Sequence, residues 1–212
     1  MKRLCIFAVF VFSCAISLAA QNSWTPIYDG KTTDGWQHVG PGGFTVENEL
    51  LETHGGMGLL WYTKRKFGSG DTIRVVFQTT AKTSNSGVYI RFPDRPKDAW
   101  YPVHFGYEVQ IDGAGDDWHC TGAIYSLSRA LKRMQKPPGE WNTMEITFDG
   151  PKTHVVLNGV TVNDFDMNSP VPPREKWFEP ERGPRALLGY IGLQNHDTGS
   201  TVRYKEVSFR GK

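Results

Sequence analysis

The chain has 212 residues, with 24 Lys and Arg against 22 Asp and Glu, so its charge is nearly balanced. A nucleic-acid-binding or anionic-membrane-binding protein would need an excess of basic residues, and this sequence has none to speak of. Seven Trp, eight Tyr and twelve Phe instead supply the apolar area of a sizeable packed core.

Residues 1–20 have the layout of a secretory signal peptide. A short basic start precedes an apolar run over residues 4–18 and two alanines. The run is shorter than the ~20 apolar residues of a transmembrane helix. We therefore expect cleavage near residues 19–21, export to the periplasm or the outside, and no transmembrane segment in the mature chain. The residues before Cys14 form a poor lipoprotein motif, which favours this interpretation over a lipid anchor.

Residues 21–212 are predicted to form a single domain. Signal removal leaves 22 basic and 22 acidic residues, and Cys120 as the one cysteine. This excludes an intrachain disulfide and a Cys-rich zinc site, so packing must hold the domain together. We interpret Cys120 as a small buried residue rather than a nucleophile.

The rest of the chain shows almost no helical periodicity. It consists of short segments in which apolar and polar residues alternate, separated by Gly, Pro and Asn-Gly or Asp-Gly pairs. This spacing predicts an all-β sandwich or barrel, with turns at Asp149-Gly150 and Asn158-Gly159. The predicted strands are Phe44–Val46, Leu50–Thr53, Gly58–Tyr62, Thr72–Thr80, Gly87–Phe92, Gly106–Ile111, Thr121–Tyr125, Asn142–Phe148, His154–Leu157, Tyr190–Gln194 and Thr201–Phe209.

The segment Phe105–Asp112 (FGYEVQID) alternates strictly between apolar and polar residues. Since side chains of a strand alternate between its faces, Glu108, Gln110 and Asp112 share one face. Two carboxylates and an amide in a row are typical of the floor of a polar groove. The same parity on other strands extends this face, if they share a sheet, with Tyr89, Arg91, Tyr125, Gln194 and His196.

These residue types suit a sugar. Planar polar side chains match the donors and acceptors of vicinal hydroxyls, and aromatic rings cover the C–H face of a pyranose. Any single residue is better explained as part of a buried polar network, but five or more convergent groups favour a ligand groove. Trp141 and Glu145, opposite the buried side of Asn142–Phe148, are further candidates for substrate binding.

The two carboxylates of the Phe105–Asp112 segment do not have the spacing of an ordinary two-carboxylate glycosidase. Glu108 and Asp112 lie four residues apart, hence ~13 Å, whereas a retaining pair needs ~5 Å and an inverting pair ~6.5–9.5 Å. A carboxylate from another strand, such as Glu145, would be required.

The sequence lacks the motifs G-x-S-x-G, H-E-x-x-H, the Walker loop and G-x-G-x-x-G. His104 shares the parity of Glu108, and His196 could lie nearby. A His and carboxylate site for a divalent metal therefore stays open, although a lone His is more often structural.

Two long segments are candidates for functional loops. Arg129–Gly139 is basic and ends in prolines, and Asn168–Arg185 contains five prolines with Trp177 and Phe178. Loops of this length are often functional. A surface excursion capped by its own aromatic residues explains the second loop equally well.

Several motifs in order carry a family likeness across nearly all of the mature chain. They are Ile27-Tyr-Asp-Gly-Lys31, Asn85-Ser-Gly-Val-Tyr-Ile-Arg91, Gly106-Tyr-Glu-Val-Gln-Ile-Asp112, Thr121-Gly-Ala-Ile-Tyr125, Gly139-Glu-Trp-Asn142, Leu157-Asn-Gly159 and Gly189-Tyr-Ile-Gly-Leu-Gln-Asn-His196. The chain resembles the 3-keto-disaccharide hydrolase domain family, also described as 3-keto-glycoside lyase/hydratase. Two departures are Asn48-Glu49, where a Gly-containing turn is usual, and the long Asn168–Arg185 loop, which leaves the substrate size open.

The resemblance implies a concanavalin A-like jelly-roll β-sandwich that acts outside the cell on sugars oxidised at C3. It thereby implies a functional link to a sugar 3-dehydrogenase. A C3 ketone acidifies the C2 proton, so a base can remove it and the C1 aglycone leaves by β-elimination; addition of water completes hydrolysis. This chemistry needs a base, an enolate stabiliser and an acid for the leaving group.

Roles follow for the residues of the polar face. Glu108 or His196 is the expected base, and Arg91 and Gln110 are the expected enolate stabilisers. Tyr125 or Asp112 would position or protonate the substrate. Tyr89, Gln194, Glu145 and Trp141 complete the predicted binding set.

Two other classes remain open. A non-catalytic carbohydrate-binding module would use the same fold and polar face, and would bind unoxidised glycans without turnover. A structural or interaction domain would bind no sugar and would expose an apolar patch instead.

Overall fold

The computed structural model describes residues 23–211, and the predicted signal peptide lies outside this range. The described chain is almost entirely β-structure, as the spacing of turn residues predicts. Its elements are β1 Thr25–Pro26, β2 Trp36–Val39, β3 Gly43–Glu47, β4 Leu50–His54, β5 Gly58–Tyr62, β6 Thr72–Thr79, β7 Asn85–Phe92, α2 Tyr101–Phe105, β8 Tyr107–Asp112, β9 Asn142–Asp149, β10 Lys152–Leu157, β11 Val160–Asp166, β12 Tyr190–Asn195 and β13 Val202–Arg210.

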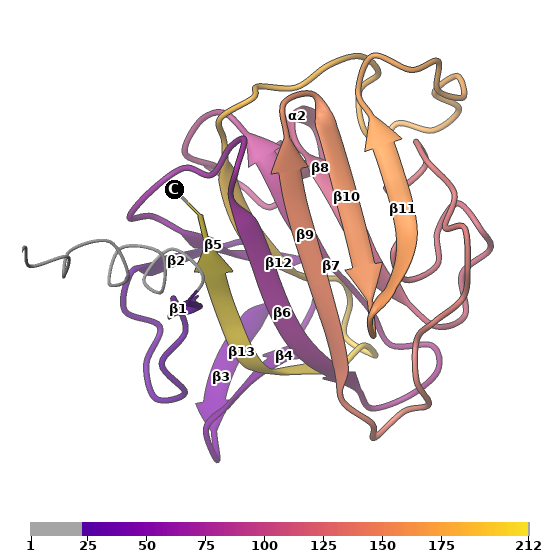
Figure 1. The fold of residues 1–212 in the computed structure, drawn as a ribbon. Coiled ribbons are helices and arrows are strands. Elements are labelled where there is room, and N and C mark those ends of the chain that lie inside the picture. Colours follow the sequence, from indigo (N-terminus) through magenta and orange to yellow (C-terminus); the bar gives the residue numbers. More distant parts are fainter. Residues whose placement is uncertain (1–22, 212) are drawn as a thin grey trace, which may run out of the picture.

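Two antiparallel sheets pack face to face (Figure 1). The first, here sheet A, has the order β11-β10-β9-β6-β13-β4-β3, with β1 paired to β13. The second, sheet B, has the order β2-β5-β12-β7-β8. The arrangement confirms the predicted all-β sandwich.

The core lies between the sheets and follows the predicted alternation. From sheet A it receives Ile73, Val75 and Phe77 on β6 and Met144, Ile146 and Phe148 on β9. From sheet B it receives Val88 and Ile90, Tyr107, Val109 and Ile111, and Ile191 and Leu193. All are almost fully buried, and burial of each such side chain contributes about 1.5–3 kcal/mol.

Hairpin turns sit where the sequence places them. Gly150 between β9 and β10, and Asn158 and Gly159 between β10 and β11, have positive φ. Asn48 and Glu49 also adopt positive φ, at 51° and 63°, so the β3–β4 turn forms without the usual glycine. Asn accepts this conformation more readily than Glu.

Five elements differ from the prediction. Residues 121–125 form no strand of their own, because Gly122 at φ +91° interrupts the extended backbone. They still run beside β8, where Tyr125 N–H donates to Glu108 O and Gln110 N–H donates to Ala123 O, both at 3.0 Å. The prediction missed β1, β2 and β11, which are short or partly exposed, and α2, which has only five residues.

No helix among the described residues is long and apolar enough to cross a membrane.

Candidate functional site

The outer face of sheet B is partly covered by the β7–β8 connection. This connection contains α2, and it packs Ala99 and Val103 onto Leu59, Trp61, Tyr89 and Phe92 in a small second core. Arg185 anchors the Asn168–Arg185 loop to the same place, by donating to the carbonyls of His104 and Gly106 at 3.0 and 3.1 Å. In Figure 1 the chain after β11 accordingly crosses the top of the molecule near α2.

Between these coverings and the sheet lies a cavity of about 350 Å³, here called the sheet B cavity. Five residues predicted for the site line it, together with four that the sequence argument did not include. The predicted ones are Glu108, Gln110, Tyr125, Gln194 and His196, and the others are Met57, Trp100, Val103 and Phe178. Glu108 and Gln110 on β8 and Gln194 on β12, which strand parity predicts to share a face, therefore line one cavity.

Three buried oxygen atoms on this floor have no hydrogen-bond partner in the protein. They are Oε1 of Glu108, of Gln110 and of Gln194, in side chains that are at most 6% exposed. The amide nitrogens are already used: Gln110 Nε2 donates to Asn85 Oδ1 at 2.9 Å, and Gln194 Nε2 donates to Tyr89 Oη at 2.6 Å. A buried unpaired acceptor is costly, so the cavity suits a ligand that brings several O–H donors.

This pairing corrects the expected role of Gln110. Its free atom is an acceptor, which suits a hydroxyl group and not an enolate oxygen. Tyr89 is fully buried beneath the cavity and orients Gln194 through their hydrogen bond.

Glu108 has an unusual protonation equilibrium for a carboxylic acid. Burial raises its pKa to about 8, although the neighbouring Tyr89 hydroxyl partly offsets this effect. Tyr125 is also affected: burial, followed by the charges of Glu108 and Glu179, raises the pKa of its phenol to about 12. A strengthened base therefore lies beside a phenol that stays protonated, a pairing typical of acid–base sites.

Gly87 on β7 makes room for Glu108. A Cβ at this position would lie 2.6 Å from Glu108 Cγ and closer still to Oε1. The β7–β8 pairing sets Gly87 opposite Gln110 and next to Glu108 on the cavity face. The glycine of the Asn85–Arg91 motif is thus explained by the carboxylate that it accommodates.

Gly87→Ala is expected to displace the Glu108 carboxyl group and to lower kcat/KM for the substrate proposed below by about 10²-fold. Overpacking should cost about 1–3 kcal/mol of stability. Gly159→Ala, in open space at φ +81°, is the control, because it strains a distant turn without touching the cavity. Thermal melting and kinetics of both variants separate the effects. Equal activity in both variants would contradict this role of Gly87.

His196 lies at the rim and is exposed. Its Nδ1 is 2.7 Å from Asp197 Oδ2, and Asp197 also accepts from Ser200 Oγ at 3.0 Å. The carboxylate fixes the orientation and tautomer of the ring, which leaves Nε2 free to interact with a ligand.

Aromatic side chains from outside the sheet complete the cavity. Trp100, which precedes α2, and Phe178 line it, and Trp177 packs on Trp100 with ring centroids 4.9 Å apart. Trp100 and Trp177 remain 37% and 66% exposed, so flat apolar surface is available at the mouth. The sequence flagged Trp177 and Phe178 in a long loop, but nothing in a periodicity argument shows which face that loop covers.

Arg91 does not reach the cavity, which corrects its predicted role. It adopts φ +59°, and the pairing of β12 with β7 shifts register between Tyr190 and Gly192. This bulge turns Arg91 inward, toward sheet A. There Nη2 donates to the carbonyls of Gly150 and Lys152 at 2.9 Å, so Arg91 connects the two sheets.

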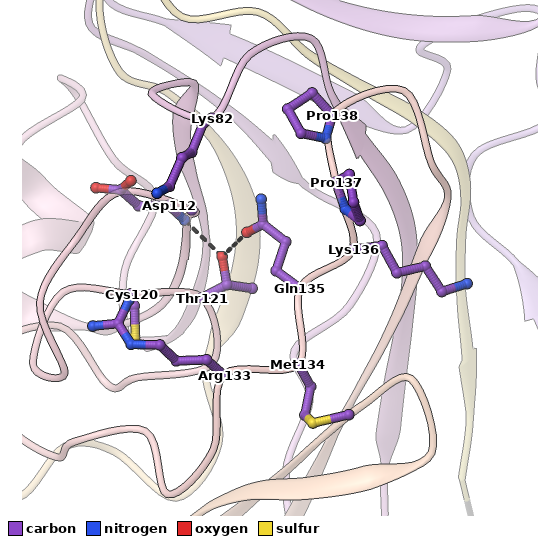
Figure 2. A pocket seen from close by; sticks show the side chains of 11 residues that line it. Lys82, Asp112, Cys120, Thr121, Arg133, Met134, Gln135, Lys136, Pro137 and Pro138 are labelled. Atoms are coloured by element: carbon purple, nitrogen blue, oxygen red, sulfur yellow. Dashed lines mark hydrogen bonds between the residues drawn. The ribbon is translucent and has the colours of Figure 1, made fainter.

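Asp112 shares the parity of Glu108 but belongs to a second cavity at the far end of β8, of about 320 Å³. Figure 2 shows its lining, with Thr121 bonded to Gln135 and to the Asp112 backbone N–H. None of the buried polar atoms without a partner lies on a residue that lines this cavity. This second cavity therefore has fewer unpaired polar atoms for binding a ligand than the sheet B cavity has. Because Asp112 lines the second cavity, it is not placed to act with Glu108.

Glu145 and Trp141 lie at sheet A, not sheet B, so their prediction as binding residues is wrong in position. Glu145 Oε1 accepts from Arg74 Nη2 at 2.9 Å on the outer face of β9. Glu108 is consequently the one carboxylate among the described residues that line the sheet B cavity. A glycosidase pair of carboxylates is not present there.

Within residues 23–211, no three His, Cys, Asp or Glu side chains group closely enough to form a candidate metal site. His104, on α2, is not part of the cavity lining. Cys120 is buried, and burial raises the pKa of its thiol, so it is placed as predicted for a structural residue.

A sequence model described as the 3-keto-alpha-glucoside-1,2-lyase-like domain matches residues 23–210. The chain belongs to this family. Membership implies a sugar oxidised at C3 as the substrate class, in keeping with the resemblance of the motifs. A comparison with curated proteins found no match.

Solved structures share the fold. A protein of Parabacteroides distasonis ATCC 8503, provisionally named a glycosyl hydrolase, is similar with a TM-score of 0.71 and 25% identity over 90% of this chain and 100% of that one. A Bacillus subtilis protein with a galectin-like fold gives a TM-score of 0.65 at 11% identity, over 90% and 95% of the chains. A Bacillus subtilis carbohydrate-binding module gives 0.57 at 16% identity, over 84% and 96%. The lectin-like architecture confirms the predicted concanavalin A-like sandwich.

Proposed function

We propose that this 3-keto-glucoside lyase-like protein cleaves 3-keto-glycosides in the sheet B cavity by β-elimination. The observation that supports this most is the single buried carboxylate, Glu108, which has a free oxygen and a pKa raised to about 8. Elimination requires one strong base, and a pair of carboxylates at glycosidase spacing is not needed.

Glu108 removes the C2 proton, which the C3 ketone has made acidic. The electron pair of the C2–H bond, held first as an enolate, forms the C1=C2 double bond. The C1–O bond breaks with its pair on the aglycone oxygen, which takes a proton from Tyr125. Addition of water across the double bond gives net hydrolysis of the glycoside.

The remaining polar residues bind and orient the sugar. The free Oε1 atoms of Gln110 and Gln194 accept from hydroxyl groups. The ring of His196, oriented by Asp197, presents Nε2 to a hydroxyl group of the sugar. Glu108 is preferred to His196 as the base, because it is buried with Oε1 free, whereas His196 is exposed and held by a carboxylate.

Trp100 and Phe178 lie on the aglycone side in this proposal, where aromatic faces cover apolar surface of a sugar. Export of the chain and its dependence on a sugar 3-dehydrogenase are parts of the same proposal, because the enzyme needs a supply of oxidised sugar.

The experiment compares a 3-keto-glucoside carrying a chromogenic aglycone with its parent glucoside, each with and without chelator. We expect release from the keto sugar alone, since the parent has no acidic C2 proton. The chelator arm addresses the divalent metal that the sequence left open. Release from neither substrate, with binding of unoxidised glycans, would favour the carbohydrate-binding module.

A further inference from the structure

A hydrogen-bonded series of side chains lies on the other side of Tyr125. His119 Nδ1 is 2.7 Å from Asp116 Oδ1, and His119 Nε2 is 3.1 Å from Ser126 Oγ. The His119 ring also packs edge-on against Tyr125, with centroids 5.1 Å apart. The proposed function leaves this series unused.

Tyr125 lines the sheet B cavity, and its ring contacts His119 of this series. His119 and Ser126 line a separate, smaller hollow with Glu179 and Arg182, of about 210 Å³. Burial, and then the charges of Glu108 and Glu179, raise the pKa of the Tyr125 phenol, whereas a side-chain hydrogen bond with Ser126 and the charge of Arg182 lower it. The His119 side chain is 37% exposed and Asp116 is 67% exposed. The series therefore runs from solvent inward to the phenol.

The local backbone is built to hold Ser126 in place. Ser126 adopts φ +57°, which is strained for a residue with a side chain. Its N–H donates to Trp118 O at 3.2 Å, and Trp118 N–H donates to Asp116 Oδ1 at 2.9 Å. The turn that carries His119 is thus bonded to the residue that follows Tyr125.

Asp, His and Ser in this order resemble the triad of acyl-transfer enzymes, but the backbone argues against that chemistry. An oxyanion hole needs free N–H groups near the nucleophile. The N–H of Ser126 donates to Trp118 O, and the N–H of Leu127 donates to Ile124 O at 2.8 Å. The guanidinium of the neighbouring Arg182 already donates to the carbonyls of Pro172, Pro173 and Pro180 and to the carboxylate of Glu179.

We propose that Asp116, His119 and Ser126 form a proton relay that restores the proton on Tyr125 after each elimination. This inference rests on the proposed function. Once the aglycone has left with the phenol proton, protonated His119 donates from Nε2 to Ser126 Oγ, and the Ser126 hydroxyl proton passes to the phenolate. His119 becomes neutral and regains a proton from water. Glu108 returns the C2 proton to water, so the cycle balances.

His119 acts through Tyr125 and does not touch the substrate, so its test needs a readout that a structural role would not move. That readout is the dependence on the leaving group. An alkoxide must be protonated as it leaves, whereas 4-nitrophenolate leaves without a proton. The two substrates are methyl and 4-nitrophenyl 3-keto-glucoside, and the variants of the purified protein are His119→Gln and Tyr125→Phe.

We expect His119→Gln to lower turnover of the methyl glycoside by about 10²-fold, and that loss should exceed the loss on the nitrophenyl glycoside by at least about tenfold. Tyr125→Phe should give the same pattern. The double variant should be no slower than Tyr125→Phe alone, because both changes remove one function.

His154→Gln is the matched control. His154 also pairs with an exposed carboxylate, Asp164 at 2.9 Å, but on β10 in sheet A. It should leave both rates unchanged. Equal losses on both substrates in His119→Gln, or additive losses in the double variant, would overturn the relay and leave the proposed function standing. Cleavage of neither substrate by the unaltered protein would overturn both.

Discussion

Glu108→Gln is expected to lower kcat/KM for a 3-keto-glucoside by about 10³-fold, because the amide cannot remove the C2 proton. The shape of the side chain is kept, so sugar binding through Gln110 and Gln194 should persist. In the unaltered protein, kcat/KM should rise with pH and level off above about 8, where Glu108 is ionised. The measurement is kcat/KM from pH 5 to pH 9.

The same variant should be more stable than the unaltered protein at high pH. The pKa of Glu108 rises from 4.5 in a free side chain to about 8 in the fold. The folded protein therefore binds more protons than the unfolded chain between these values, and stability falls as pH rises through this window. At pH 9 the gain from Glu108→Gln should be on the order of 5 kcal/mol, or roughly 10–20 °C in Tm. At pH 4.5 it should be near zero.

Glu145→Gln serves as the control for both measurements. Glu145 is partly exposed and paired with Arg74 on the other sheet, so its loss should cost at most about 1 kcal/mol and leave activity intact. Full activity of Glu108→Gln would remove Glu108 as the base. A Tm difference that does not change with pH would contradict the buried, protonated carboxyl group.

The polar residues on the floor of the sheet B cavity can be predicted from the sequence, because a strand has only two faces. Glu108 and Gln110 on β8, and Gln194 on β12, lie together because β12, β7 and β8 are neighbours in sheet B. Parity alone does not identify the sheet, and Glu145 has the right alternation on the wrong one. Nor does parity limit distance: Asp112 follows Glu108 on the same face but reaches another cavity.

Residues outside the strands were beyond such an argument. Met57, Trp100, Val103 and Phe178 come from loops and a five-residue helix, and only tertiary packing brings them over the cavity. Ser126 and His119 belong to a turn whose conformation depends on backbone bonds between residues 116 and 126. Strand parity predicts the wrong face for Arg91, because one bulge residue reverses the alternation of side chains along β7. The register shift between β7 and β12 that marks this bulge can be seen only in the folded structure.

Arg91→Met is expected to lower stability by about 3–5 kcal/mol, since several buried acceptors lose their donor at about 1–3 kcal/mol each, with a matching fall of ~6–20 °C in Tm. Arg91 is 1% exposed, and besides Gly150 and Lys152 it donates to Leu187 O at 3.3 Å. Removal of the guanidinium leaves these buried carbonyls without a donor. Arg91→Lys should recover only part of the loss, since one amine cannot reproduce the planar fork of donors.

Activity separates this structural role from the enolate-stabilising role that the sequence suggested. Measured well below its Tm, Arg91→Met should keep kcat/KM within about threefold of the unaltered protein, because its side chain points away from the sheet B cavity and toward Gly150 and Lys152. Arg95→Met, exposed and close in sequence, is the control and should change neither Tm nor activity. A fall in kcat/KM without a fall in Tm would support a catalytic role for Arg91. The bulge in β7 would then have to rearrange when the substrate binds.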